Sequence, residues 1–165
     1  MLKFLNKKKN DNKGFSLVEL IIVVAILAIL VGLLAPQYIK YVEKSRKSAD
    51  ASNLSEMVNA VQIYAADAES SLPAGTYTIT ISKDNTTISG DTADKKVEKA
   101  IAETAPDFKS TKLKSSKWED GKENTPIVAN IEVDNNGGTK VTYSPQKLRD
   151  FINNKATTAA SSETK

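Results

Sequence analysis

The sequence contains no cysteine and no histidine among its 165 residues. Without cysteine there is no disulfide, no thiolate zinc site and no cysteine nucleophile. Without histidine the commonest general base and metal ligand is missing. The remaining carboxylates, lysines, serines and tyrosines form no recognisable catalytic motif or phosphate-binding loop. We therefore expect no enzyme activity, no cofactor and no metal site.

Positive charge is concentrated in a short head, although the formal net charge is +3. Residues 1–14 hold five lysines and one aspartate, a net charge of +4. The other 18 basic and 19 acidic residues leave residues 15–165 at −1. A nucleic-acid-binding domain concentrates positive charge on its folded surface. The distribution argues against such a domain, and no nucleic-acid partner is required.

A long apolar segment follows the basic head. Residues 15–35 carry a single charge, Glu19. As a helix these 21 residues would be about 32 Å long, which matches the hydrocarbon core of a bilayer. Because the lysines directly precede the segment, we expect residues 1–14 in the cytoplasm and the chain after Pro36 outside.

Three interpretations of this segment compete. An ordinary secretory signal has an apolar core of about 7–15 residues and small residues before its cleavage point. This run is longer. Its end, Leu33-Leu34-Ala35 followed by Pro36, does not have the small residues of such a cleavage point, and the proline would hinder cleavage. The second interpretation is a permanent single-pass anchor. The third is a segment cleaved before the apolar run, between Gly14 and Phe15.

The residues KGFSLVELIIVVAILAIL, from Lys13 to Leu30, favour the third interpretation. They resemble the class III signal peptide of the type IV pilin family. In that family a basic leader ends in Gly, Phe follows, a Glu lies four residues later, and a Pro lies near the end of the helix. Gly14, Phe15, Glu19 and Pro36 match in type and spacing. The resemblance covers about residues 7–45, and the lack of cysteine favours a Gram-positive, clostridial-type major pilin.

The resemblance implies that a prepilin peptidase cleaves between Gly14 and Phe15 and methylates the new Phe15 amine. It also implies that Glu19 pairs with this amine on a neighbouring subunit. A carboxylate within the bilayer costs about 2.5–3.5 kcal/mol on insertion scales. A charge pair would offset this desolvation and set the axial register between subunits. The alternative is a Glu19 side chain that snorkels to the membrane surface.

Two further features concern the apolar helix. Small residues recur at spacings of 3, 4 and 3 along one helix face: Ala25, Ala28, Gly32 and Ala35. Small residues let helices approach closely in an apolar medium, so we predict that this stripe packs against other helices. Pro36 removes a backbone donor and should kink the helix. The alternative is a helix that ends there, at the membrane surface.

The rest of the chain predicts an α+β fold in which the long N-terminal helix packs on a small antiparallel β-sheet. Apolar residues at helical spacing continue the helix to about residue 70. Further elements are expected at 76–82 (strand), 93–104 (helix), 113–119, 126–133 and 139–144 (strands in a meander) and after Pro145 (helix), with a frayed tail from Asn153. The pilin resemblance implies the same layout.

Other chemistry-bearing residues have structural explanations. Residues 134–137, Asp-Asn-Asn-Gly, are better explained by a hairpin turn than by a calcium loop, because the full ligand series is missing. Trp118 and Tyr143 could be adhesion contacts on the surface. We predict instead that both are half-buried strand residues.

We therefore expect three regions: a cleaved cytoplasmic leader (1–14), a transmembrane and filament-core helix (15–36) and an extracellular globular domain (37–165). The resemblance implies a structural subunit, a major pilin, of a filament used for adhesion, surface motility or aggregation. Its implied partners are further copies of itself, the prepilin peptidase, an inner-membrane platform with an ATPase, and the membrane before assembly. A minor pilin, a pseudopilin of a type II secretion or competence system, and a membrane-anchored binding domain that never polymerises stay open.

Overall fold

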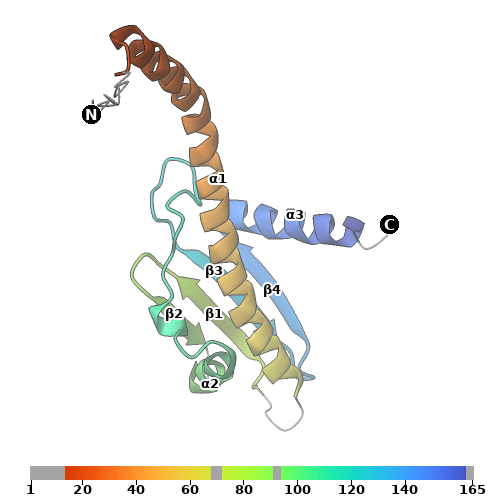
Figure 1. Cartoon of the computed structure of the whole chain (residues 1–165). Helices are drawn as coiled ribbons and strands as arrows, with labels where there is room; N and C mark the ends of the chain where they lie inside the picture. Colours follow the sequence, from red (N-terminus) through yellow and green to blue (C-terminus); the bar gives the residue numbers. More distant parts are fainter. Residues whose placement is uncertain (1–13, 68–71, 91–93, 163–165) are drawn as a thin grey trace, which may run out of the picture. The chain divides into compact units, whose positions relative to one another are not determined.

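A computed structural model describes residues 14–67, 72–90 and 94–162. The chain divides after Lys40 into an N-terminal unit and a globular unit that begins at Tyr41. One helix, α1 (Leu17–Ala66), contributes to both. The other elements, labelled in Figure 1, are β1 (Gly75–Ile81), β2 (Thr86–Gly90), α2 (Asp94–Thr104), the 3-10 helix η1 (Phe108–Ser110), β3 (Ile127–Val133), β4 (Thr139–Ser144) and α3 (Gln146–Ser162).

The globular unit is built on a four-stranded antiparallel sheet in the order β2-β1-β3-β4. In the two central strands, alternate residues are buried, as in the pairs Tyr77–Ile131 and Ile79–Ala129. Successive strand residues point to opposite faces. The apolar residues of β1 and β3 therefore line one face of the sheet.

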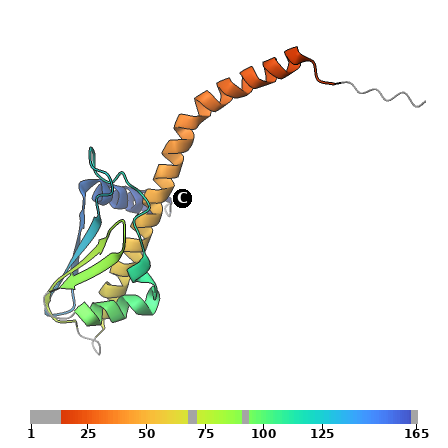
Figure 2. The same ribbon diagram turned by 90° about the vertical axis from the view of Figure 1, so that its left-hand side faces the viewer.

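The second half of α1 covers that face. Its buried apolar residues recur every three or four positions: Leu54, Met57, Val58, Val61 and Ala65. Such spacing forms one continuous apolar helix face. Figures 1 and 2 both show this part of α1 crossing the sheet. The expected α+β fold, a long helix packed on a small antiparallel sheet, is confirmed.

One expected strand is absent. Residues 113–119 belong to an irregular segment with an isolated bridge between Glu119 and Lys122. Because the backbone N–H groups of Lys114 and Ser115 both donate to the Asp50 carboxylate, these adjacent residues cannot join a strand ladder. The sheet is therefore not the expected meander. The neighbours of β1 are β3 and the unpredicted β2, whose single large apolar residue, Ile88, gives little sequence signal.

The helix after Pro145 is confirmed, and Leu148 is buried in the core. Helical structure continues to Ser162, although the sequence predicts fraying from Asn153. The alanines in this segment favour a helix by intrinsic propensity. At the other boundary, α1 ends at Ala66, a few residues before the expected position.

The turn between β3 and β4 rests against the end of α1. Gly137 has φ +78°, and a Cβ there would lie 2.4 Å from the carbonyl oxygen of Ala65. Gly121 has a similar φ of +74°, but a Cβ there would have no neighbour within 4 Å. A side chain at Gly121 would therefore meet only backbone strain, whereas a side chain at Gly137 would meet backbone strain and a steric clash.

Replacing Gly137 with alanine should destabilise the globular unit more than replacing Gly121. Gly121→Ala should cost about 1–2 kcal/mol, because only the left-handed backbone is strained. Gly137→Ala adds a clash with backbone that cannot rotate away, so we expect a loss of about 3 kcal/mol or more. Denaturant unfolding of the full chain in detergent, followed by the fluorescence of the single tryptophan, measures both. Equal losses would contradict the contact between the turn and α1.

Candidate assembly site

The N-terminal unit presents an apolar surface on every side of α1. Even Leu30, the least exposed of the large apolar side chains between Leu17 and Ile39, has 48% of its surface accessible. By length and composition α1 can cross a membrane, and its most apolar window has a mean hydropathy of 3.2. Soluble proteins rarely expose so large an apolar surface. Lipid or other helices must therefore cover it.

The predicted cleavage site directly precedes α1. Gly14, Phe15 and Ser16 lie outside regular secondary structure, and the helix begins at Leu17. Phe15 is 90% exposed, and no heavy atom lies within 4 Å of a Cβ built on Gly14. The Gly14–Phe15 bond is thus accessible to a protease. Residues 1–13, with all five lysines of the leader, lie outside the described residues.

Glu19 lies in the first turn of α1 and caps its own helix. Its Oε2 accepts a hydrogen bond of 2.9 Å from the backbone N–H of Ser16. In return, Ser16 Oγ accepts one of 3.3 Å from the N–H of Val18. These contacts resemble a capping box, in which Ser and Glu satisfy free N–H groups at a helix start. The spacing Ser-x-x-Glu before an apolar run could have revealed this pair, but the sequence analysis missed it.

The partner that Glu19 has within its own chain is a neutral backbone N–H group, not a cation. Within the described residues, no cation forms an ion pair with Glu19. The cap therefore fixes where the carboxylate points without neutralising it. The geometry leaves Glu19 able to accept a cationic partner from outside its own chain.

The predicted packing stripe and Pro36 lie on the same helix. Ala25, Ala28, Gly32 and Ala35 are all exposed, so their common face is open to another helix. Pro36 lies inside α1, and the helix continues for thirty residues after it. The alternative of a helix that ends at Pro36 is therefore wrong. The kink and the packing role stay predictions.

A family model described as the prokaryotic N-terminal methylation motif matches residues 9–35. The chain is a type IV pilin-like protein. The motif is typical of type IV pilins and pseudopilins and implies processing by a prepilin peptidase. No curated protein and no solved structure matches the chain. Beyond the motif, the likeness to pilins rests on the long helix packed against an antiparallel sheet.

The sequence prediction of a pilin-type signal is thus confirmed, and the pilin family is generally non-enzymatic. Among the described residues, no group of three or more Asp or Glu side chains could hold a metal ion. Asp134 Oδ1 accepts hydrogen bonds from the N–H groups of Asn136 and Gly138. This confirms the expected hairpin turn between β3 and β4.

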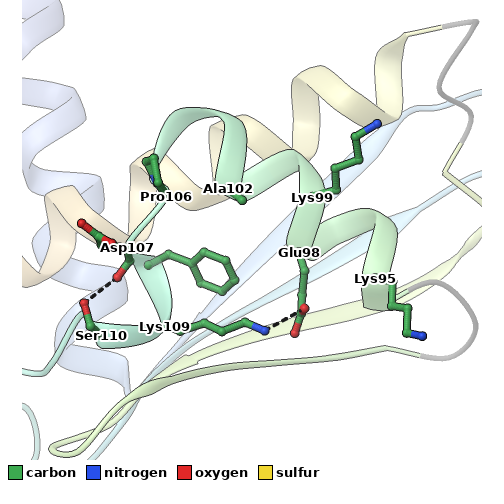
Figure 3. Close-up of a pocket in the computed structure, with 9 residues that line it drawn as sticks. Lys95, Glu98, Lys99, Ala102, Pro106, Asp107, Lys109 and Ser110 are labelled. Atoms are coloured by element: carbon green, nitrogen blue, oxygen red, sulfur yellow. Dashed lines mark hydrogen bonds and ion pairs between the residues drawn. The ribbon is translucent and has the colours of Figure 1, made fainter.

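A groove of the globular unit lies between α2 and η1 and has a volume of about 480 Å³. Figure 3 shows Lys109 reaching Glu98 across it, with Nζ 2.8 Å from Oε2. Phe108 is buried beneath Lys109, whose Nζ lies 5.7 Å from the ring centroid. Among the charged side chains that line it, Lys109 and Glu98 form an ion pair. The groove gives no support for catalysis.

A second polar cluster joins α1 to the irregular segment 111–126. Asp50 is completely buried, and its carboxylate accepts hydrogen bonds from the N–H groups of Lys114 (2.8 Å) and Ser115 (2.9 Å). It also accepts one of 3.1 Å from Trp118 Nε1. We call these four residues the Asp50 clasp. It ties the segment to α1 without a disulfide.

Trp118 is completely buried and lies outside any strand, so its expected place as a half-buried strand residue is wrong. Its ring meets Phe151 of α3 edge-on at 5.9 Å, and Lys47 Nζ lies 5.2 Å from its centroid. Tyr143 is half-buried on β4, as expected, and burial raises the pKa of its hydroxyl. The clasp therefore extends from α1 through Trp118 to α3.

Two contacts reinforce the clasp. Ser115 Oγ donates a hydrogen bond to Glu43 on α1, and Lys147 of α3 pairs with Asp120. The hydrogen bond from Lys147 holds the pKa of the Asp120 carboxyl below its usual value. Burial, followed by the nearby charge of Lys147, lowers the pKa of Lys47. The ion pair between Lys147 and Asp120 thus connects the segment 111–126 to α3.

Proposed function

We propose that the chain is the structural subunit, the major pilin, of a type IV pilus. The observation that carries the proposal is an exposed apolar helical segment, residues 17–35, that bears one acidic residue and lies within the N-terminal methylation motif. A permanent anchor needs the apolar length but has no use for an acid in the first helical turn. A helix that moves from the membrane into a bundle of identical helices uses the apolar length for packing and the acid for pairing with a neighbouring copy.

In the proposed sequence of events, residues 15–36 span the cytoplasmic membrane, with the leader 1–14 inside and residues 37–165 outside. The prepilin peptidase cleaves the Gly14–Phe15 bond and methylates the new amine. The methylated amine of Phe15 remains a cation. It becomes the partner of Glu19 on a neighbouring copy, because opposite charges attract strongly where water is excluded.

The filament core in this proposal is a bundle of N-terminal helices. The surface that faces lipid before assembly faces other copies afterwards, so apolar burial is largely conserved. Small residues at 25, 28, 32 and 35 allow close approach of the helices, which increases van der Waals contact in the absence of water. As the resemblance to type IV pilins implies, assembly in this proposal uses a platform protein and an ATPase.

We further propose that the filament lies on the cell surface and serves adhesion, surface motility or aggregation. A pseudopilin would carry the same motif and the same helix. The two functions differ in product: a major pilin dominates the filaments sheared from cells. Mass spectrometry of sheared filaments therefore distinguishes them by the abundance of this chain.

The mature product should begin at N-methylated Phe15. In Gly14→Val, a branched side chain would hinder the close approach of the peptidase to the backbone. We expect the variant to keep its leader and form no filaments. Intact-mass measurement of the membrane-bound chain reads the N-terminus, and Gly32→Ala, a change where a Cβ meets no neighbour within 4 Å, is the control that should be cleaved normally. A native product that still starts at Met1 would support the permanent anchor.

A further inference from the structure

Only two large apolar side chains are exposed in the described part of the globular unit. Tyr41 is 73% exposed and Ile63 is 71% exposed. Both lie on α1, with Ile63 22 positions after Tyr41, or about 33 Å along the axis. At about 100° per residue they lie within about 40° of one another around the helix. Both therefore occupy the side of α1 opposite its buried face.

Ile63 borders a groove between α1 and α2. The groove has a volume of about 230 Å³. Ala60, Tyr64 and Ala100 contribute its small and aromatic surfaces, and exposed acidic side chains at its rim come from Asp67 and Glu103. Lys99 is the one basic residue of the lining. The groove therefore offers an apolar floor with a net negative rim.

Tyr41 has the complementary character. It projects from α1 one helical turn before Lys44, whose basic side chain is exposed and lies on the same side of the helix. The acidic residue next to Lys44, Glu43, is partly buried and hydrogen-bonded to Ser115. An exposed aromatic ring beside a basic side chain complements a partly apolar groove with an acidic rim in polarity and charge.

We propose that Tyr41 of one copy docks against Ile63, in the groove between α1 and α2 of another copy. This inference rests on the proposed filament. The two surfaces lie at different places on the same molecule, so every copy offers both. Such a head-to-tail contact is not two-fold, and it produces an open helical polymer when its rotation does not close a ring. A contact of Ile63 with Ile63 would instead be two-fold and stop at a dimer.

Paired cysteines test this contact, since the native chain has none. The full chain with both Tyr41→Cys and Ile63→Cys is assembled in cells, and sheared filaments are treated with a short bismaleimide. A linker is needed because contacting side chains need not bring their Cα atoms within the roughly 7 Å that a disulfide requires. We expect a ladder of multimers on a denaturing gel. Tyr41→Cys or Ile63→Cys alone should give none.

A matched control pairs Tyr41→Cys with Lys140→Cys, an equally accessible position on β4, and should give no ladder. If the double variant assembles poorly, co-expression of the two single-cysteine chains with the wild type should give dimers that contain one of each. Dimers from Ile63→Cys alone would overturn the head-to-tail contact. Normal filaments without cross-links would also overturn it and leave the proposed function intact. Absence of filaments from the wild-type chain would instead overturn the proposed function.

Discussion

Glu19→Ala should abolish filaments while the chain remains inserted in the membrane. Alanine is apolar and helix-forming, so membrane insertion becomes easier, by at most the about 2.5–3.5 kcal/mol that a charge costs at the helix centre. The same change removes the counter-charge for the Phe15 amine of the neighbouring copy, and every contact along the filament loses it. Electron microscopy of sheared material measures the filaments, and cell fractionation measures insertion.

Glu19 also caps its own helix, so a charge effect must be separated from a capping effect. Glu19→Gln keeps a side-chain oxygen for the N–H of Ser16, which serves a capping box as well. It removes only the charge, and we expect it to block assembly. Ser16→Ala removes the hydroxyl that accepts from Val18 but keeps the charge. The loss of such a cap costs about 1 kcal/mol of helix stability, and filaments should still form.

The opposite pattern would reject the electrostatic account. If Glu19→Gln assembles normally and Ser16→Ala does not, the carboxylate acts by fixing the helix start. If Glu19→Ala assembles as the wild type does, neither role is needed. Cleavage after Gly14 should be checked in each variant, because an uncleaved chain has no Phe15 amine and would lack filaments for that reason alone.

The N-terminal region was predictable because its chemistry is local. The leader, Gly14, Phe15 and Glu19 lie within a few residues of one another, and an apolar run of this length has few possible surroundings. The match of residues 9–35 to the methylation motif confirms that prediction. The capping pair of Ser16 and Glu19 is equally local. Its signal in the sequence is the spacing Ser-x-x-Glu directly before an apolar run.

The globular unit was predictable where one pattern dominated. Alternating apolar residues in the sequence predicted β1 and β3, where alternate residues are indeed buried. Apolar residues at helical spacing from Leu54 to Ala65 predicted the packed face of α1. Residues 113–119 failed because a distant side chain decides their conformation. Asp50, 64 positions before Lys114, takes the N–H groups that a strand would have used. The local sequence of residues 113–119 gives no sign that a distant carboxylate will bind these N–H groups.

Asp50 itself carried a signal. It lies four residues before Leu54, so the helical period places this carboxylate on the buried face of α1. A buried acid must find donors, and its presence predicts that some other segment supplies them. The sequence does not say which segment, because many loops offer two free N–H groups. Only the fold shows that residues 114–118 do so and that Trp118 provides the third donor.

Asp50→Ala should strongly destabilise the globular unit. It leaves two buried donors without a partner, the N–H group of Ser115 and the indole Nε1 of Trp118, together with the partly buried N–H group of Lys114. Each unsatisfied buried group costs about 1–3 kcal/mol, so we expect a loss of about 3 kcal/mol or more. Domains of this kind are stable by only about 5–15 kcal/mol, so much of the fold's margin would be lost.

Denaturant unfolding of the full chain in detergent, followed by circular dichroism, measures this loss, and Trp118 emission should shift to the red as water reaches the indole. The matched control is Glu56→Ala, which removes an exposed acid from the same helix and should change stability by at most about 0.5 kcal/mol. Asp50→Asn, which keeps the volume and one acceptor oxygen, should fall between them. If Asp50→Ala unfolds at the same denaturant concentration as Glu56→Ala, the clasp does not hold the segment, and apolar packing around Trp118 suffices in its place.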